Sequence, residues 1–271
     1  MVVALTIAGS DSGGGAGIQA DLKTFAALGV YGTSAITAIT AQNTLGVSAV
    51  LALDPALVVA QIDAVATDLR PRATKIGMLA NAGIIAAVAD AITRHELLHV
   101  VIDPVMVAKG GDHLLESAAV AALRERLLPL ADVLTPNVPE AEVLTGLTIR
   151  TVEDLKTAAA RLIGMGARSV VVKGGHLEGP AIDVWHDGTR WEEFSSERIN
   201  TPHTHGTGCT FSSAIAGGLA NGLETVAAIR AAKDYVTGAI RHAPGLGSGH
   251  GPLRHDWRSE DRGTHVFGRD L

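Results

Sequence analysis

The sequence predicts an α/β protein, a three-layer sandwich in which helices cover both faces of a mostly parallel central sheet. Short β-branched runs alternate with longer segments rich in alanine and leucine along most of the chain, the pattern of successive strand-helix units. The composition is 47% hydrophobic but only 3% aromatic, as expected where aliphatic side chains fill helix-on-sheet interfaces. A length of 271 residues suits one domain with one large core, which we place at residues 1–258.

The first half of the chain begins with a buried apolar strand and continues as strand-helix repeats. Gly29 suits the left-handed position that ends a helix. Asp54 and Pro55 supply an N-cap and a first-turn proline for the next helix, and Asn81 caps the third. The strands expected here are Val2–Ala8, Tyr31–Thr40, Thr74–Met78 and Val100–Asp103. The expected helices are Ala16–Leu28, Pro55–Leu69, one that begins after Asn81, and 116–128.

The second half continues this alternation and departs from it once. Asp187 and Gly188 lie between two short runs within 181–194 and predict a hairpin, which gives the sheet a small antiparallel edge. Residues 259–271 lack apolar periodicity and are predicted to form a flexible tail. The other expected strands are Asp132–Thr135 and Ser169–Lys173. The expected helices are Pro139–Leu144, Thr151–Met165, 208–220 and 224–241.

The composition argues against several classes of function. The formal net charge is -6, and no basic run or aromatic stripe offers a surface for nucleic acid. Cys209 is the only cysteine, so the chain can form neither an internal disulfide nor a cysteine-based zinc site, which fits a reducing cytoplasm. Every hydrophobic run is interrupted well before the roughly 20 residues of a membrane helix. The histidine spacings are also not those of a zinc site: His203, His205, His250 and His255.

A glycine-rich loop, residues 9–17, lies between the first strand and the first helix, where backbone amides can face a ligand. Its spacing matches the dinucleotide fingerprint only in part, and residues 22–53 contain no acid for a ribose. No Gly-Lys-Ser/Thr follows, which argues against a P-loop. Asp21, one turn into the helix, predicts a carboxylate that accepts hydrogen bonds from a ligand. The alternatives are a purely structural turn and a surface acid.

A second loop, Thr204–Thr210 with the sequence THGTGCT, directly precedes an apolar helix. Gly206, Thr207 and Gly208 expose N–H groups at a helix start, which predicts an anion hole for a transferred phosphoryl group. At this place the helix dipole is expected to lower the pKa of Cys209, so that its sulfur accepts the proton of an attacking hydroxyl. The alternative is a small buried apolar side chain.

Polar residues also stand at the carboxyl ends of expected strands, the edge where open α/β sheets bind ligands. Asp103 ends one strand, and Asn137 and Glu140 follow the next. Their oxygens suit Mg²⁺ and its waters beside phosphates, although an acid near a helix start is also an ordinary cap. Lys173 ends a third strand and predicts a cation for ATP phosphates, the alternative being a lysine that extends to water.

Eight blocks, in order along the chain, carry a resemblance to a known family. They are AGSDSGGGAGIQAD at 8–21, TAITAQNT at 37–44, KIGML at 75–79, DPVMVAK at 103–109, TPNVPEAEVLTG at 135–146, VVVKGGHLEG at 170–179, THGTGCT at 204–210 and GHGPL at 249–253. Together they are similar to the hydroxymethylpyrimidine/phosphomethylpyrimidine kinase family of thiamine biosynthesis, a branch of the ribokinase-like superfamily. The resemblance spans roughly Val3 to His255.

The resemblance implies a ribokinase-like fold and a kinase that uses ATP and Mg²⁺. Its substrate would be 4-amino-5-hydroxymethyl-2-methylpyrimidine, and both this alcohol and its monophosphate would be phosphorylated, usually by a homodimer. Asp103 and Glu140 would bind the metal, and catalysis would rest on Lys173 and on Gly206–Cys209. The ATP phosphates would be bound by Asn137, Lys173 and Thr207. The pyrimidine pocket would be lined by Gly9, Ala16, Asp21, Thr40, Gln42, Met78 and Val105, where Gln42 and Asp21 pair with polar atoms of the ring and Met78 and Val105 form an apolar wall.

Some features depart from the family pattern. Cys209 stands where other ribokinase-like members carry aspartate, so positioning and charge stabilisation are expected to matter more than base strength. Gly13 and Gly110 stand where serine is common, and Arg254 where asparagine is common. Two alternative functions stay open at this stage: a pyridoxal kinase with the same Gly-Thr-Gly-Cys loop, and a non-catalytic pyrimidine-binding regulator.

Overall fold

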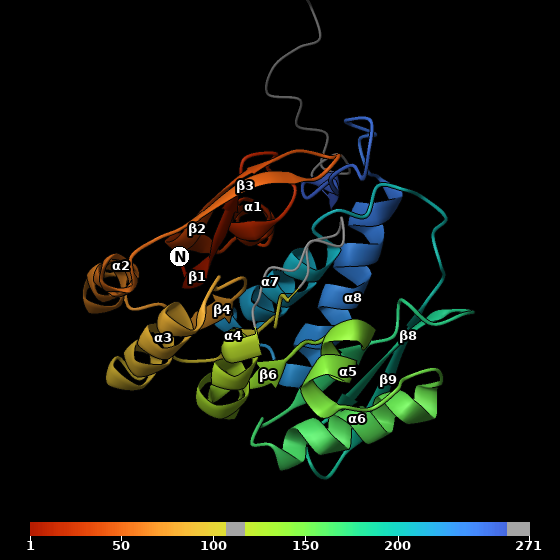
Figure 1. The fold of residues 1–271 in the computed structure, drawn as a ribbon. Coiled ribbons are helices and arrows are strands. Elements are labelled where there is room, and N and C mark those ends of the chain that lie inside the picture. The colour runs from red at the N-terminus through yellow and green to blue at the C-terminus, as the bar shows by residue number, and fades with distance from the viewer. Residues whose placement is uncertain (107–116, 259–271) are drawn as a thin grey trace, which may run out of the picture.

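The structure, a computed structural model, describes residues 1–106 and 117–258. These residues form a nine-stranded sheet with the order β3-β2-β1-β4-β5-β6-β7-β8-β9, covered by helices on both faces (Figure 1). The strands are β1 Val3–Asp11, β2 Tyr31–Gln42, β3 Val47–Ala52, β4 Ala73–Ile76, β5 Val100–Ile102, β6 Val133–Leu134, β7 Val170–Lys173, β8 Ala181–His186 and β9 Trp191–Ser196. The helices are α1 Gly17–Ala27, α2 Pro55–Asp68, α3 Ala82–Arg94, α4 Ser117–Ala122, α5 Val138–Thr145, α6 Val152–Gly164, α7 Thr207–Ala220 and α8 Thr225–Arg241.

The central strands are buried on both faces, which explains their continuous apolar sequences. In β5, Val100 and Ile102 belong to the core beneath α2, α3, α5 and α6. Val101, between them, belongs to the second core beneath α1, α7 and α8. Successive side chains of a strand point to opposite faces, so a strand between two helical layers needs apolar residues at every position. This arrangement confirms the predicted three-layer α/β fold.

The strands of the sheet centre run parallel, and those of one edge form the predicted hairpin. β2, β1, β4, β5, β6 and β7 pair in parallel, whereas β8 pairs antiparallel with both β7 and β9. Asp187 closes the hairpin turn by accepting hydrogen bonds from the backbone N–H groups of Thr189 and Arg190. The carboxyl ends of six neighbouring strands therefore meet at the same edge of the sheet.

The opposite edge of the sheet is also antiparallel, which the sequence pattern did not predict. β3 pairs antiparallel with β2, Ile39 opposite Leu51. Residues 48–52 are all exposed, so their sequence carries no alternation between a buried and a solvent face. The position of β3 is therefore set by backbone pairing with β2 and not by a hydrophobic pattern of its own.

Helix boundaries follow the predicted caps, with one irregular segment. Asn81 and Asp54 accept hydrogen bonds from the first turns of α3 and α2 at 2.9 and 2.8 Å. The helix expected at 116–128 is regular only over α4. It continues as a π-helical turn at Leu123–Leu127 and a 3₁₀ turn at Leu128–Leu130, where Pro129 has no N–H to donate. Residues 107–116 and 259–271 lie outside the described residues. They include the last three residues of the block at 103–109, Gly110, the first residue of the helix expected at 116–128, and the predicted tail.

No helix in the described ranges is long and apolar enough to cross a membrane. After α8 the chain folds back onto that helix. Trp257 donates from Nε1 to the backbone oxygen of Tyr235 at 3.1 Å, and its ring stacks on His242. Leu253 and His255 are buried beside it. The segment between α8 and Arg258 is thus part of the packed structure.

We predict that Gly238→Ala destabilises the protein because a methyl group at this position of α8 would overlap the indole ring of Trp257. The expected loss is about 1–3 kcal/mol in the free energy of unfolding, measured by urea denaturation. Gly164→Ala is the matched control: it also lies in a helix, and a methyl there meets nothing within 4 Å. This control should raise stability by up to about 1 kcal/mol. Equal effects of the two substitutions would contradict the proposed packing of Trp257.

Candidate active site

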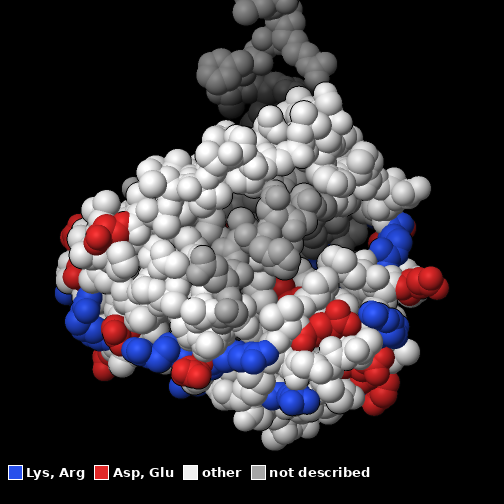
Figure 2. Space-filling model, viewed as in Figure 1, with Lys and Arg blue, Asp and Glu red and all other residues white. Residues whose placement is uncertain are grey.

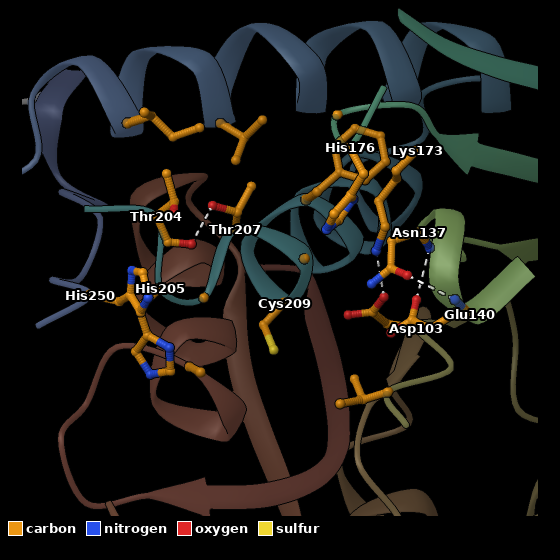
Figure 3. Close-up of a pocket in the computed structure, with 18 of the residues that line it drawn as sticks. Asp103, Asn137, Glu140, Lys173, His176, Thr204, His205, Thr207, Cys209 and His250 are labelled. Atoms are coloured by element: carbon orange, nitrogen blue, oxygen red, sulfur yellow. Dashed lines mark hydrogen bonds and ion pairs between the residues drawn. The ribbon is translucent and has the colours of Figure 1, made fainter. Parts of the chain in front are cut away.

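A cavity of about 950 Å³ opens at the carboxyl-end edge of the sheet. Its wall contains the ends of β1, β2, β4 and β7, the segments after β5 and β6, the first turn of α7 and part of α8. The structure brings all of the predicted site residues into this wall except Asp21. Figure 3 shows Asp103, Asn137, Glu140 and Lys173 gathered on one side of Cys209, with His205 and His250 on the other.

The charged end of the cavity is built from three neighbouring strands. Asp103 follows β5, Asn137 follows β6 and Lys173 ends β7. Lys173 Nζ lies 2.8 Å from Asp103 Oδ1, which also accepts a 3.3 Å hydrogen bond from the Thr135 hydroxyl. The pair packs against Gly208, where a Cβ would lie 3.2 Å from the Asp103 carboxylate. The small residue in the α7 loop thus leaves room for a buried ion pair.

Asn137 and Glu140 form a capping box at the start of α5. Asn137 Oδ1 accepts from the Glu140 N–H at 2.9 Å, and Glu140 Oε2 accepts from the Asn137 N–H at 2.8 Å. The cap that the sequence offered as the alternative is therefore real. Both side chains also line the cavity, so the structural role leaves their remaining polar atoms available to a ligand.

Burial and neighbouring charges shift the pKa values at this end. Burial raises the pKa of Glu140 to about 7; Lys173 opposes this shift, and Asp103 adds to it. Burial alone would lower the pKa of Lys173, but the carboxylates of Asp103 and Glu140 outweigh it and raise that pKa. Two carboxyl groups thus compete for one cation. Added positive charge beside them would favour the ionised form of Glu140.

The α7 loop forms the other wall of the charged end. Gly206 adopts φ +81°, and a Cβ there would overlap the backbone oxygen of Gly15 in the first glycine-rich loop. The Thr207 hydroxyl donates to the backbone oxygen of Thr204 at 2.7 Å. The N–H groups of the first turn of a helix have no acceptor within the helix. The N–H of Thr207 donates to the backbone oxygen of Thr204 at 3.4 Å, which leaves the N–H groups of Gly208 and Cys209, two residues that line the cavity, for an anion hole.

The Cys209 thiol is less acidic than the sequence suggested. Burial raises its pKa to about 11, and the charges of Asp21 and Asp103 contribute to the rise, while Lys75 and the backbone N–H of Gly17 oppose it. The predicted lowering by the helix dipole is therefore wrong, because burial outweighs it. At neutral pH the side chain is a thiol and not a thiolate.

The opposite end of the cavity contains six of the predicted ring-binding residues. They are Gly9, Ala16, Thr40, Gln42, Met78 and Val105. A Cβ on Gly9 would lie 2.7 Å from Met78 Cε, so glycine lets the methionine side chain approach the backbone of β1. The Thr40 hydroxyl lies 3.1 Å from Gln42 Oε1, which holds the amide of Gln42 at the cavity wall.

Asp21 does not line the cavity. It is fully buried in α1, where its carboxylate accepts hydrogen bonds from Thr6 and Ser213, each at 2.6 Å, and from Lys75 at 2.9 Å. The predicted direct contact with a ring is therefore not supported by its position. Asp21 reaches the site through Lys75, which does line the cavity.

The residues of the cavity wall that the sequence argument did not assign include Asp11, Lys75 and His205. Asp11 accepts hydrogen bonds from N–H groups of the first loop and, at 2.9 Å, from His205 Nε2 of the second. Burial would raise the pKa of Asp11, but these hydrogen bonds outweigh it and lower that pKa. Each of these residues lies inside one of the eight sequence blocks that carry the family resemblance. The one signal in the sequence that could have pointed to Lys75 is its charge within an otherwise apolar strand.

Comparisons with known proteins agree with this geometry. A model of the family described as phosphomethylpyrimidine kinase matches residues 11–254. The hydroxymethylpyrimidine/phosphomethylpyrimidine kinase of Bacillus subtilis is 52% identical over 254 residues, which cover 93% of this chain and 94% of that protein. The thiamine biosynthesis bifunctional protein of Geobacter sulfurreducens is 54% identical over 258 residues, and there the match covers 95% of this chain but only 53% of the relative.

A solved structure gives the same fold. The ADP complex of Bacillus subtilis pyridoxal kinase superimposes with a TM-score of 0.89 at 43% sequence identity and covers 96% of this chain and 99% of that one. A pyridoxal kinase and the pyrimidine kinases therefore share this architecture, and the fold alone does not separate the two substrates.

We predict that Glu140 makes the ligand-free protein less stable as the pH rises. Its pKa increases from 4.5 to about 7 on folding, so the folded state binds the proton more tightly than the unfolded state between these values. The stabilisation is complete below about pH 4.5 and is lost as the pH rises through 7. Relative to Glu140→Gln, the free energy of unfolding of the wild type should fall by up to about 1.4 kcal/mol per pH unit between pH 5 and 7. Parallel pH profiles in urea denaturation would contradict this.

Proposed function

The chain belongs to the phosphomethylpyrimidine kinase family, and we propose that it transfers the γ-phosphoryl group of ATP to 4-amino-5-hydroxymethyl-2-methylpyrimidine and then to the resulting monophosphate. One observation carries this proposal. A single cavity joins an apolar slot with one side-chain amide to a charged end under a helix N-terminus, and Cys209 lies between the two.

The end of the cavity that contains Gln42 and Met78 suits a small flat heterocycle. Met78 and Val105 supply apolar surface, and Gly9 adds no side chain that would block a ring. The amide of Gln42 offers both a donor and an acceptor, as a ring with nitrogens and an exocyclic amine requires. Few polar groups in an otherwise apolar slot are the usual basis of specificity in ligand pockets.

The charged end suits the phosphates of ATP. Lys173 would contact them as a cation, and Asn137 and Thr207 would supply hydrogen bonds. The first-turn N–H groups of α7 would stabilise charge on the phosphoryl group in transfer. The nucleotide is also supported by the related pyridoxal kinase, which was solved as an ADP complex.

We propose that Mg²⁺ binds with the nucleotide beside Asp103 and Glu140. No group of three or more metal-ligating side chains gathers within the described ranges. Mg²⁺ is usually held by one or two carboxylates together with substrate phosphates and water. Burial is the main cause of the raised pKa of Glu140, and the neighbouring carboxylate of Asp103 adds to the rise. When bound, the metal would neutralise phosphate charge and orient the phosphates.

Cys209 would act mainly by position. With a pKa of about 11, the thiol holds its own proton at neutral pH and is a weak acceptor for the proton of a hydroxyl. Close placement of the two reacting groups and stabilisation of the transferred charge must therefore supply most of the rate enhancement. This supports the expectation drawn from cysteine standing in place of aspartate.

We expect purified protein with ATP and Mg²⁺ to convert the hydroxymethylpyrimidine to its monophosphate and then to its diphosphate. Phosphorus NMR of the reaction mixture would identify the products. The alternative, pyridoxal phosphorylation, is favoured by the 43% identical pyridoxal kinase, so pyridoxal is assayed in parallel. Because several relatives at 52–54% identity are named hydroxymethylpyrimidine/phosphomethylpyrimidine kinases, kcat/KM should be higher for the pyrimidine. Turnover of pyridoxal alone would overturn the proposal, and ligand binding without ATP consumption would favour a non-catalytic regulator.

We also propose that the enzyme is a cytoplasmic homodimer formed through the β2–β3 edge. Residues 24–53 contain no charged residue, and Figure 2 shows an uncharged surface over these strands. Ile39 and Leu51 lie opposite each other and are 48% and 64% exposed. An uncharged, exposed edge strand is normally covered. A second copy would cover it, and the single reduced cysteine suits the cytoplasm.

Leu51→Lys is expected to shift the protein from dimer to monomer in sedimentation velocity at micromolar concentration, because a charge would enter an apolar interface. Leu98→Lys is the matched control, since Leu98 is similarly exposed, at 56%, but lies away from β3. A wild type that sediments as a monomer, or equal effects of both substitutions, would exclude this interface.

A further inference from the structure

Asp11 and His205 form a largely buried pair in the cavity wall, beside the side chain of Gln42. His205 Nε2 lies 2.9 Å from Asp11 Oδ2, and the two side chains are 12% and 3% exposed. Gln42 Nε2 lies 3.3 Å from the same nitrogen of His205. All three residues line the cavity. One ring nitrogen therefore faces a carboxylate on one side and a side-chain amide on the other.

The carboxylate decides whether this ring nitrogen donates or accepts. Asp11 accepts hydrogen bonds from backbone N–H groups of the first glycine-rich loop at 2.8–3.0 Å. Burial would raise the pKa of Asp11, but its hydrogen bonds to His205 and to the backbone outweigh burial and lower that pKa. Asp11 is therefore ionised at neutral pH and can only accept. A lone pair on His205 Nε2 would meet this charge at 2.9 Å, so Nε2 carries a proton and donates it.

A proton on His205 Nε2 determines which way the amide of Gln42 is turned. The structure sets the Gln42 nitrogen against His205 and the Gln42 oxygen 3.1 Å from the Thr40 hydroxyl, so that two N–H donors face each other. The single Thr40 proton already has an acceptor, the backbone oxygen of Ser10 at 2.9 Å. A half-turn about the Cγ–Cδ bond exchanges the two amide atoms. The oxygen then accepts from His205, which shares its proton between two acceptors, and the nitrogen donates to Thr40.

We propose that His205, held by Asp11, is a positioning residue that directs the Gln42 oxygen toward the α7 loop and thereby decides which way round the pyrimidine binds. This inference rests on the proposed function, because it concerns the orientation of that substrate. His205 acts through Gln42 and does not itself contact the reacting atoms. The proposal adds a direction to a contact that the amide alone leaves open, since an amide offers a donor and an acceptor in either order.

The substrate can match only one order of these two groups. Its amine at C4 stands between ring N3 and C5, the carbon that carries the hydroxymethyl arm. An amide pairs with both N3 and the amine only when its N–H meets N3 and its oxygen meets the amine. With the Gln42 oxygen on the His205 side, the amine and the arm beside it lie on that side, where the loop leads into α7 and to Cys209 (Figure 3). The 2-methyl group then lies toward Thr40.

The fixed amide also favours a pyrimidine over a pyridine. The ring nitrogen of pyridoxal has no amine beside it, so pyridoxal cannot use the donor and the acceptor of Gln42 together. A site that is built to pair with two polar atoms discriminates against a ligand that lacks one of them. His205 is thus expected to contribute to the choice between the two substrates that share this fold.

The proton on His205 is measured first, in the ligand-free protein. Long-range ¹H–¹⁵N NMR distinguishes the two nitrogens of a histidine ring, and the His205 signals are assigned by their loss in His205→Gln. We expect Nε2 to carry a proton at neutral pH. A ring protonated at Nδ1 alone would refute the proposal, because its Nε2 would accept from Gln42. This measurement needs no substrate and is independent of the proposed function.

The orientation of the ring is measured next, with the pyrimidine alcohol bound in the absence of ATP. Nuclear Overhauser effects should connect the methylene protons of the hydroxymethyl arm with the His205 ring. They should connect the 2-methyl protons with the methyl group of Thr40. The reverse pattern, or equal effects from both groups to both residues, would show that the amide does not set the orientation. A protein that does not bind the alcohol would instead argue against the proposed function.

Kinetics of two variants separate positioning from a merely structural role. His205→Leu removes the donor, whereas His205→Gln keeps an N–H group of similar reach. With saturating ATP and Mg²⁺, kcat/KM for the alcohol should fall about three- to tenfold in His205→Leu, because the Gln42 side chain is no longer held in place before binding. His205→Gln should recover most of this loss. For the analogue without the 4-amino group the loss should be at least about twofold smaller, since only one hydrogen bond has to match.

His250→Leu is the matched control. His250 also lines the cavity, but its Nδ1 lies 3.2 Å from the backbone oxygen of Pro202 and not against Gln42. This substitution should change kcat/KM for the alcohol and for the analogue by the same factor. Equal losses for both compounds in His205→Leu, or no recovery in His205→Gln, would exclude a positioning role. A wild type that does not phosphorylate the alcohol would reject the proposed function, and the NMR measurement on His205 would still decide the state of its ring.

Discussion

The position of every functional side chain depends on the burial of the central strands on both faces. A strand such as β5, with Val100 and Ile102 in one core and Val101 in the other, has no position left for a polar group along its length. Polar residues are confined to its end, where Asp103 follows. Because the neighbouring strands run parallel, their ends meet at one edge, and residues from distant parts of the sequence gather in one cavity.

Charge compensation decides what this cavity can hold. Among the described residues three lysines line it, and each is paired with an aspartate: Lys75 with Asp21 at 2.9 Å, Lys173 with Asp103 at 2.8 Å and Lys233 with Asp183 at 2.7 Å. An unpaired ammonium would be too costly at this depth. Pairing keeps three cations in a buried wall, which suits a family of enzymes that transfer phosphoryl groups.

The two glycine-containing loops act as one structural unit. Gly206 allows the α7 loop to approach the backbone of Gly15, and His205 joins the same two loops through Asp11. The contact sets the N-terminus of α7 against the first glycine-rich loop at the cavity wall. Cys209 lies at this junction, where burial keeps its thiol protonated. The chemistry proposed there would depend on placement and surrounding charge more than on the basicity of one side chain.

The sequence by itself determined the order of strands and helices in the centre of the fold, because apolar periodicity and helix caps such as Asn81 are local features. It also located Asp103, Asn137 and Lys173 and the loop before α7 in the cavity wall, since residues at strand ends and loops are adjacent in sequence to the strands that carry them. The tertiary structure decided the rest. β3 exists because β2 offers its backbone edge, and Asp21 lies behind Lys75 rather than at a ring. The pKa of Cys209 rises because of burial and charges that other segments supply. The burial of a side chain and the electrostatic potential at its atoms depend on residues that are distant in the sequence. The pKa of Asp11, for example, is lowered in part by His205, and the sequence around Asp11 does not show that the two residues meet.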